Sequence, residues 1–531
     1  MSKNSFLKGA FILGMAGLVV KILGAFFRIP LGNIIGSEGM GYYQTSYPIY
    51  VLLLTISSAG FPTAISKMVA EKRALGDNKG AHRVFKISFV AMIVLGILTS
   101  SLLFFGAGFI VGQLKNPKAF YSMVAIAPAL LFVPIMAAYR GYFQGRNNMT
   151  PTAVSQIIEQ FGRVILGLGL GILFLKKGTE FAAAGAAFGA TAGAVFGTIF
   201  MVLIYYMSRK KIKREVEKSE NFKEETTSTI MKQLLFIAVP ITIGASVLPI
   251  MNMIDVSVVM SRLQASGFTQ AEANSLYGQL TGMAATLINL PQVLTMALAM
   301  SLVPVISHSF ALGDLESARK DTKTAIKTAL LLGLPAGAGL MVLATPIMQL
   351  LYPKEPAEIG QILFVLSVGV IFLSLIQTLT GILQGMGKAH IPVINLMIGS
   401  IVKVCCTYFL TAIPSLNVKG AAIGTVAAYT IAALLDLYYV KKLLGIKFDK
   451  TEFVIKPFLS VGLMSASVLI TYKVLRLVLG NSLSTIGGIG VGVIVYGIML
   501  LLTGGISRKD LETNPKGKKL AKILGKTGLL K

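Results

Sequence analysis

Residues 74–86 read ALGDNKGAHRVFK, and the pattern returns at residues 311–323 as ALGDLESARKDTK, 237 positions later. Each copy follows an apolar segment that carries a late proline, Pro62 in GFPTAIS and Pro304 in LVPVISH. A repeat over such a distance is a property of the whole architecture rather than of one local element. The stretch therefore indicates a chain built from two similar halves.

Two further pairs of stretches support this duplication. RGYFQG at residue 140 matches TGILQG at residue 380, and GAAFGA at residue 185 matches GAAIGT at residue 420. The three offsets are 237, 240 and 235, and the landmarks keep one order along the chain. Such agreement rarely arises by chance, so we interpret it as an internal repeat.

Composition places these halves in a membrane. The chain has 531 residues, of which 54% are hydrophobic and only 13% are charged, whereas soluble domains carry about 25% charged residues. Apolar runs of about 20 residues recur along the chain, and each can cross a hydrocarbon core of ~30 Å. The formal net charge of +27 is then explained by basic loops on one side of the membrane, and nucleic acid is not an expected partner.

We predict an all-α polytopic membrane protein with about fourteen transmembrane helices. A helix of about 20 residues spans the bilayer, which sets the expected length of each segment. The predicted spans are 6–32, 42–66, 87–111, 119–143, 152–175, 181–207, 234–261, 276–306, 328–350, 358–384, 391–413, 419–440, 453–475 and 483–505.

The repeat pairs the second predicted span with the eighth, the fourth with the tenth, the fifth with the eleventh and the sixth with the twelfth. Because six spans separate the partners, the two six-helix lobes have the same orientation and form a parallel repeat. The predicted organisation is an N-terminal lobe, a cytoplasmic linker, a C-terminal lobe, an added helix pair and a basic cytoplasmic tail, at 1–207, 208–233, 234–441, 453–505 and 506–531.

The distribution of Lys and Arg predicts the orientation. Outside the spans they concentrate before the first span, in the even-numbered loops and in the C-terminal tail. Cytoplasmic loops of membrane proteins carry this excess. We therefore expect a multi-pass protein of the cytoplasmic membrane with both termini in the cytoplasm.

Charged residues inside the predicted spans are the candidate binding residues, because such residues usually face a bundle interior or a watery cavity. Adding the offset of 240 to Arg163 gives Lys403, so each half places a cation at the same position. Glu159 lies one turn before Arg163 and can partly neutralise it, whereas its counterpart is Gly399. The remaining positive charge favours an anionic ligand.

Each of these charges also has a structural interpretation. Glu159 and Arg163 are spaced for an ion pair along a helix, which could serve packing alone. Lys21 and Arg28 lie on the first span, and Arg28 is close enough to its outer end for the side chain to reach the interface. Lys403, in the middle of its span, is the hardest to explain as a structural residue.

Motifs for enzymatic chemistry are missing from the sequence. LQGMGKAH resembles a nucleotide-binding loop but lacks its first glycine and its final Ser or Thr, so no nucleotide is expected. Three dispersed histidines and two adjacent cysteines give no metal set, and we expect the cysteines to be buried and inert; these residues are His82, His308, His390, Cys405 and Cys406. We predict a transporter without a cofactor, driven by a gradient or by the membrane potential.

Three stretches resemble a known family: GMAGLVVKILGAFFRIPLGNIIG near the start, GFPTAISKMVAEKRALGD, and RGYFQGRNNMTPTAVSQIIEQFGRV. They are similar to the polysaccharide-transporter branch of the MATE-like (MOP) flippase superfamily, and most to Gram-positive lipid II flippases of the MurJ type and stage V sporulation protein B. The similarity covers residues 5–505. It implies a flippase that moves an undecaprenyl-pyrophosphate-linked saccharide across the membrane by alternating access.

The resemblance also implies a set of site residues. Lys21 and Arg28 take the places of the cavity cations on the first helix of MurJ-type proteins. Two positions depart from that pattern: Ile29 replaces an acid, and Thr286 stands where a cavity arginine is expected on the eighth helix. With the amides of the third stretch, the predicted substrate-binding residues are Lys21, Arg28, Gln144, Gln156, Glu159, Arg163 and Lys403.

Three other functions remain open from the sequence. The same fold and charges would serve a flippase for another polyprenyl-linked glycan, such as a teichoic-acid, capsule or O-unit precursor. A drug or cation antiporter of the same superfamily would call for acidic residues in the lobes, where the first span carries two cations. A scaffold or membrane enzyme would need either no charges inside the spans or a catalytic set facing water.

Overall fold

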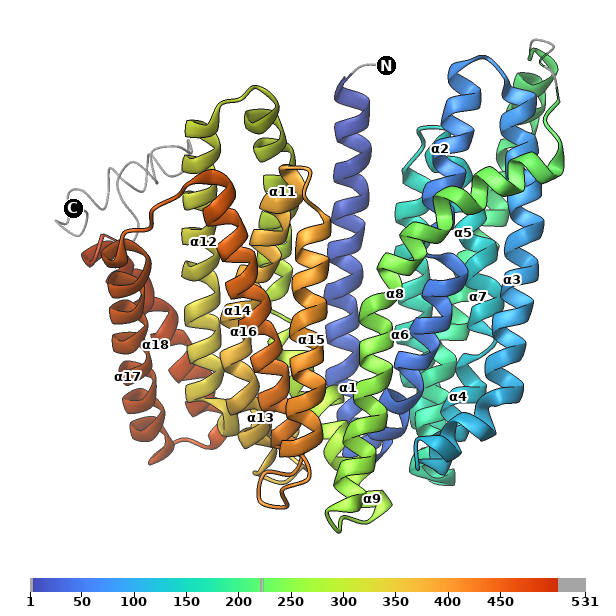
Figure 1. The fold of residues 1–531 in the computed structure, drawn as a ribbon. Helices are drawn as coiled ribbons and strands as arrows, with labels where there is room; N and C mark the ends of the chain where they lie inside the picture. The colour runs from blue at the N-terminus through green and yellow to red at the C-terminus, as the bar shows by residue number, and fades with distance from the viewer. Residues whose placement is uncertain (1–2, 220–221, 223, 505–531) are drawn as a thin grey trace. The chain divides into compact units, whose positions relative to one another are not determined.

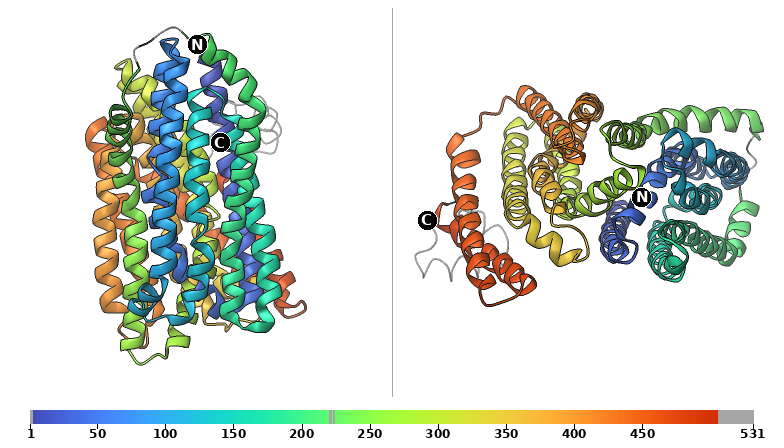
Figure 2. Two further views of the ribbon diagram at one scale, coloured as in Figure 1. Left: turned by 90° about the vertical axis from the view of Figure 1, so that its right-hand side faces the viewer. Right: turned by 90° about the horizontal axis from the view of Figure 1, so that it is seen from below.

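The computed structural model describes residues 3–219, 222 and 224–504, and every regular element in that part of the chain is a helix. Figures 1 and 2 show long helices that run up and down side by side within each of two compact units. The first unit is Met1–Met283 and the second begins at Ala284. The predicted basic tail, 506–531, lies outside the described residues.

The first helix, α1 (Lys3–Ser58), contains two of the predicted spans. Its 56 residues include Gly36 at φ 66°, a left-handed conformation that glycine tolerates best. A straight helix of that length would be about 84 Å long, far more than one bilayer. The chain instead reverses at this break and rises again toward α2 (Phe61–Ala74), as Figure 1 shows in blue.

The predicted number of spans is confirmed. Among the described residues, thirteen helical segments are long and apolar enough to cross a membrane, and the first of them, Ile12–Ala74, covers two predicted spans. The other helices of the first unit are α3 (Asn78–Gln113), α4 (Phe120–Ile126), α5 (Ala129–Gly145), α6 (Thr150–Phe174), α7 (Thr179–Glu217), α8 (Thr227–Ala265) and α9 (Gln270–Tyr277).

The second unit continues in the same manner. Its helices are α10 (Ala285–Ile288), α11 (Gln292–Ala311), α12 (Leu315–Val342), α13 (Ala344–Leu351), α14 (Ile359–Gly385), α15 (His390–Leu410), α16 (Val418–Leu444), α17 (Lys456–Arg476) and α18 (Asn481–Leu502).

The two ALGD stretches form the same local structure. Gly76 and Gly313 both have positive φ, 83° and 72°, and each ends one helix immediately before the next begins. Asp77 then caps α3 by accepting a hydrogen bond from the Gly80 amide at 2.6 Å, and Asp314 caps α12 in the same way from the amide three residues on, at 3.0 Å. A side-chain acceptor satisfies one of the free amides at a helix start.

Helix packing repeats as well. A Cβ added to Gly141 of α5 would lie 2.8 Å from the Pro62 carbonyl oxygen of α2, and one added to Gly381 of α14 would lie 2.8 Å from the Ala299 carbonyl oxygen of α11. The two glycines are 240 positions apart and the two carbonyls 237. Glycine permits this close approach of backbones between membrane helices. The sequence repeat is therefore also a repeat of helix–helix contacts.

The eighth predicted span, 276–306, is not one continuous helix. α9 passes into a wide-turn π-helical segment, Gly278–Ala284, and the helix breaks again before α11 begins after Pro291. Proline removes a backbone donor and clashes with the preceding turn, which accounts for the second break. The chain enters the second unit within this interrupted segment.

Hydrogen bonds connect α9 to the rest of the first unit. The Asn274 amide donates to the Glu38 carbonyl oxygen at 2.7 Å, and the buried Asn116 amide donates to the Asn274 side chain at 2.8 Å. The hydroxyls of Ser37 and Ser275 lie 2.7 Å apart. These bonds explain why α9 groups with the first unit. α8 groups with that unit as well, although the repeat assigns α8 to the second lobe; the division into two lobes stays a prediction.

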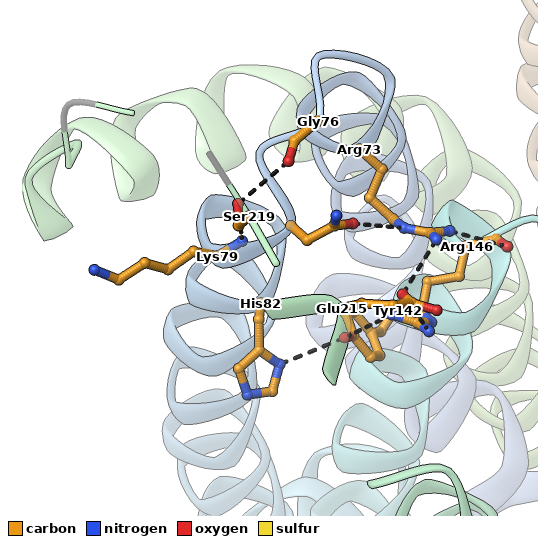
Figure 3. Close-up of polar contacts among 9 residues, drawn as sticks. Arg73, Gly76, Lys79, His82, Tyr142, Arg146, Glu215 and Ser219 are labelled. Atoms are coloured by element: carbon orange, nitrogen blue, oxygen red, sulfur yellow. Dashed lines mark hydrogen bonds and ion pairs between the residues drawn. The ribbon is translucent and has the colours of Figure 1, made fainter. Parts of the chain in front are cut away.

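α7 continues to Glu217, past the predicted end of its span at residue 207. Glu215 on this extension accepts from Arg73 at 3.3 Å and from Arg146 at 3.0 Å, and Figure 3 shows the three side chains pointing toward one another. Arg73 also donates to Asn78 at 3.3 Å. The cluster ties together the adjacent ends of α2, α3, α5 and α7.

The segment after α7 adds further ion pairs to this end of the unit. Lys79 lies 2.7 Å from Glu224, Arg83 pairs with the same carboxylate, and Lys72 lies 2.5 Å from Glu225. The hydrogen bond and charge of Lys79, with those of Arg83, lower the pKa of the Glu224 carboxyl below its ordinary value. The described part of the predicted linker 208–233 thus contacts the α2–α3 turn.

The expectation that both cysteines are buried was wrong. Cys405 is exposed and Cys406 is partly buried. A Cβ added to Gly424 of α16 would lie 3.3 Å from the Cys406 Cβ, so Cys406 faces α16. Because neighbouring residues of a helix do not share a face, Cys405 points away from that contact.

Candidate functional site

The candidate site is a cluster of ionised side chains at the contact of α5 and α6. On α6, an oxygen of Glu159 lies 3.6 Å from an amino nitrogen of Arg163 one turn further on. The other Glu159 oxygen lies 3.0 Å from an amino nitrogen of Arg140 on α5. The three side chains are only 13–17% exposed. Glu159 therefore bridges two largely buried arginines.

The second half of α1 completes the cluster with tyrosines. Arg163 donates to the Tyr47 hydroxyl at 3.4 Å, and the Arg28 guanidinium lies 5.9 Å from the centre of the Tyr47 ring. Tyr43 stacks on Tyr47 with ring centres 5.7 Å apart. A ring face attracts a cation. The structure thus brings Arg28 and Arg163 to one aromatic side chain, although they are far apart in the sequence.

Three buried polar atoms in this region lack a hydrogen-bond partner among the described residues. They are the Nε atom of Arg163 and the side-chain oxygen of Gln156, on the same face of α6, and the hydroxyl of Tyr50, whose ring lies 5.9 Å from that of Tyr47. Nearly all buried polar groups in proteins are paired, so each exception calls for an explanation. A donor and an acceptor left open beside the ion pairs are what a polar ligand would use.

The charge of the cluster indicates the sign of that ligand. Two arginines, Arg140 and Arg163, pair with the single carboxylate of Glu159, and a third, Arg28, lies over the Tyr47 ring to which Arg163 donates. The guanidinium group is planar and matches phosphate oxygens in a forked, two-bond geometry. An excess of positive charge in a nearly closed membrane site therefore favours an anion, and phosphate in particular.

Close packing of α6 against α7 fixes the position of the Glu159–Arg163 ion pair relative to α7. A Cβ added to Gly193 of α7 would lie 2.2 Å from the Glu159 carbonyl oxygen, and one added to Gly189 would lie 2.6 Å from the Arg163 carbonyl oxygen. In the second unit, a Cβ added to Gly424 of α16 would lie 3.0 Å from the Lys403 carbonyl oxygen. Gly189 and Gly424 are related by the repeat offset of 235, so Arg163 and Lys403 occupy equivalent places in their helix pairs.

The other predicted site residues lie elsewhere. Lys21 is exposed on the first half of α1, about two turns before Arg28. Gln144 donates to the Thr152 hydroxyl at 3.4 Å, at the end of α5 away from Glu159. Lys403 is partly buried on α15 in the second unit.

Arg140 was missing from the predicted site. It stands near the end of its predicted span, in RGYFQG, where we interpreted the stretch as a landmark of the repeat. A charge near a helix end has an ordinary explanation as an interfacial residue. The usable signal was that Arg140, Glu159 and Arg163 all belong to the one motif that carries the family resemblance.

Comparison with solved structures identifies the fold. The fold matches the lipid II flippase MurJ in an inward closed conformation, with a TM-score of 0.69, 18% identity and coverage of 92% of this chain and 98% of that one. It also matches an inward-facing multidrug resistance MATE transporter of the MOP superfamily, with a TM-score of 0.69, 16% identity and coverage of 83% and 98%. The fold is that of a multi-pass transporter.

Sequence comparison then gives the family. A family model described as polysaccharide biosynthesis protein matches residues 6–310, and a MatE model matches residues 280–409. Stage V sporulation protein B of Bacillus subtilis (strain 168) is 30% identical over 522 residues, 97% of this chain and 98% of that protein. The chain belongs to the polysaccharide biosynthesis protein family, which confirms the resemblance.

A second relative indicates the kind of transporter. The lipid II flippase MurJ of Bacillus subtilis (strain 168) is 28% identical over 499 residues, 91% of this chain and 90% of that protein. The chain is accordingly a membrane transporter of the group that contains the MurJ-like flippases, and its relatives are transporters rather than enzymes.

Proposed function

We propose that this protein moves a polyprenyl-pyrophosphate-linked saccharide across the cytoplasmic membrane by alternating access, and that the saccharide is that of peptidoglycan lipid II. The single observation that carries the proposal is the arginine cluster around Glu159, with its open Arg163 Nε atom. The similarity to MurJ of Bacillus subtilis, a lipid II flippase, supports the choice of lipid II.

The chemistry of the substrate matches the cluster. A pyrophosphate carries negative charge that cannot enter hydrocarbon without compensation. Arginine side chains replace its hydration with charge-assisted hydrogen bonds, while the prenyl tail remains in the lipid. A cationic cargo would be repelled by the same side chains. The halves of the repeat, 1–207 and 234–441, would open the path to each side of the membrane in turn.

A flippase for another polyprenyl-linked glycan is the second candidate. Two residues favour it: Ile29 replaces the acid, and Thr286 replaces the cavity arginine, that the resemblance to MurJ-type proteins leads one to expect. Thr286 is 2% exposed on the short helix α10. A different saccharide on the same pyrophosphate would need the arginine cluster but not those two groups.

Reconstitution tests the function. Purified protein in liposomes that contain lipid II should make the inner-leaflet substrate accessible to an impermeant enzyme that modifies the saccharide from outside. Liposomes with undecaprenyl-pyrophosphate-linked glycans of other composition, run in parallel, decide between the two candidates. Equal accessibility with and without protein, for every substrate, would remove both.

We also propose that both termini face the cytoplasm, because Lys and Arg concentrate on that side. Cysteines introduced at Ser415 and Ala265, both exposed, should react with an impermeant thiol reagent added to intact cells. Cysteines at Lys210 and Lys320, also exposed, should react only after permeabilisation. The background replaces Cys405 and Cys406 by serine, because Cys405 is itself exposed. The opposite labelling pattern would reverse the orientation.

A further inference from the structure

A buried carboxylate in the second unit has no role in the arginine cluster. Asp436 on α16 is 1% exposed and Asn395 on α15 is 2% exposed. The Asn395 amide donates to one carboxylate oxygen of Asp436 at 2.7 Å. The other oxygen, Oδ2, is buried and has no hydrogen-bond partner among the described residues. One half of the carboxylate is therefore unsatisfied.

Apolar side chains surround this pair. Ala432 and Ala433, one turn before Asp436, belong to a buried cluster with Ile376 of α14. Val440, one turn after it, belongs to the larger buried cluster of the second unit. An isolated ionised carboxylate in such surroundings costs far more free energy than a neutral one, unless a cation or several donors compensate it.

No compensating cation is bonded to Asp436 in the described part of the chain. α14 has no ionisable residue. On α15, the nearest ionisable residues in the sequence are His390 and Lys403. On α16 they are Tyr429, Tyr438, Tyr439 and Lys441. From α12, Arg319 donates to the Leu444 carbonyl at the end of α16. None of them forms an ion pair with Asp436 in that part of the structure.

The equivalent place in the first unit is built differently. By the offset of 240, Asn395 corresponds to Ser155, whose hydroxyl accepts from Arg140 at 2.9 Å. Arg140 itself corresponds to Thr380. The arginine that serves this position in the first half is thus replaced by a neutral residue in the second half, where the buried carboxylate stands.

We propose that Asp436 and Asn395 form a proton-binding site of this transporter. A proton from water bonds to Oδ2 of the carboxylate, which becomes neutral, and it leaves to water when α15 separates from α16. The bound form keeps the Asn395 hydrogen bond on the other oxygen. Oδ2–H then donates to a helix carbonyl, as hydroxyls do one turn back along a helix.

The position of Asp436 gives the proton a short route. α16 ends at Leu444, eight residues beyond Asp436, or about 12 Å along the helix. Lys441 and Lys442 mark that end as the membrane boundary. Uptake and release of the proton would therefore change how tightly α15 packs on α16 near one face of the membrane. This inference does not depend on which lipid-linked glycan is moved.

Infrared difference spectroscopy of the full-length protein in lipid tests the proposal. The wild type should show the carbonyl stretch of a protonated carboxylic acid at neutral pH, and the band should disappear reversibly as the pH is raised. Asp436→Asn should lose this band. Asp255→Asn, which removes a buried aspartate of α8, is the matched control and should keep the band.

A second variant separates proton binding from a purely structural pair. Asn395→Ala removes the hydrogen bond to the charged form, so the band should disappear about one to two pH units higher than in the wild type. A band that is absent at every pH, or one that Asp436→Asn leaves in place, would overturn the proposal. A band that belongs to Asp436 but never responds to pH would also overturn it, because that proton does not exchange.

Discussion

Replacing Arg163 by alanine should weaken binding of the polyprenyl-pyrophosphate substrate by roughly ten- to a hundredfold, because a hydrogen bond to a charged group contributes about 1.5–3 kcal/mol. The protein should still reach the membrane in normal amounts. The structure explains why: Glu159 keeps its ion pair with Arg140 at 3.0 Å when Arg163 is lost. Flipping by the reconstituted variant, compared at equal protein, measures the effect.

Related variants separate binding from packing. Arg163→Lys keeps the charge and loses the forked geometry, so it should retain part of the activity. Lys403→Ala should weaken binding to a similar degree if Lys403 contacts the substrate in the second half of the repeat as Arg163 does in the first. If Arg163 and Glu159 are only a structural pair, the double variant Glu159→Gln, Arg163→Gln should recover both expression and transport. That recovery would end the assignment of Arg163 to the binding site.

Replacing Gly193 by alanine should destabilise the protein by about 1–3 kcal/mol, the usual cost of overpacking. The added Cβ would lie 2.2 Å from the Glu159 carbonyl oxygen and 3.1 Å from the Arg163 amide nitrogen. α6 must then move away from α7, and the ion pair moves with it. Transport should fall as well, although no polar group has been changed. The fraction of protein that stays monodisperse after heating in detergent measures the stability.

Gly169 provides the matched control on the same pair of helices. It lies on α6 with nothing within 4 Å of an added Cβ, so Gly169→Ala should leave stability equal to the wild type or raised by up to about 1 kcal/mol. Equal heat resistance of Gly193→Ala and Gly169→Ala would show that close packing on α7 does not set the position of Glu159 and Arg163.

The helical architecture could be predicted because its causes are local in the sequence. Apolar runs set the spans, and the ALGD stretches carry both the glycine and the aspartate that end one helix and cap the next. The prediction was wrong in one respect, because it treated the eighth span as one continuous helix. Pro291 and the wide-turn segment Gly278–Ala284 interrupt the eighth span. Hydropathy does not register such breaks, because the residues there are uncharged and their polar side chains are averaged with apolar neighbours.

The candidate site was predictable in part. The offset of 240 identified Arg163 and Lys403 as equivalent, and the motif contained Glu159. Arg140 was missed because its contact with Glu159 joins two different helices. Sequence periodicity shows which residues share a face of one helix, but not which residues of two helices meet. Arg28 and Tyr47 lie on two predicted spans, and the reversal between them was expected, but the contact of the two side chains across that reversal follows from no pattern in the sequence.

The most direct test of the central claim is binding of undecaprenyl pyrophosphate to the purified protein, measured by native mass spectrometry. Undecaprenol, which has the same tail without the phosphates, is the control ligand. We expect the pyrophosphate to bind the wild type, and Arg163→Ala to bind it ten- to a hundredfold more weakly, while the undecaprenol signal stays equal for both proteins. Equal binding of the pyrophosphate by wild type and Arg163→Ala would contradict a pyrophosphate site in the arginine cluster.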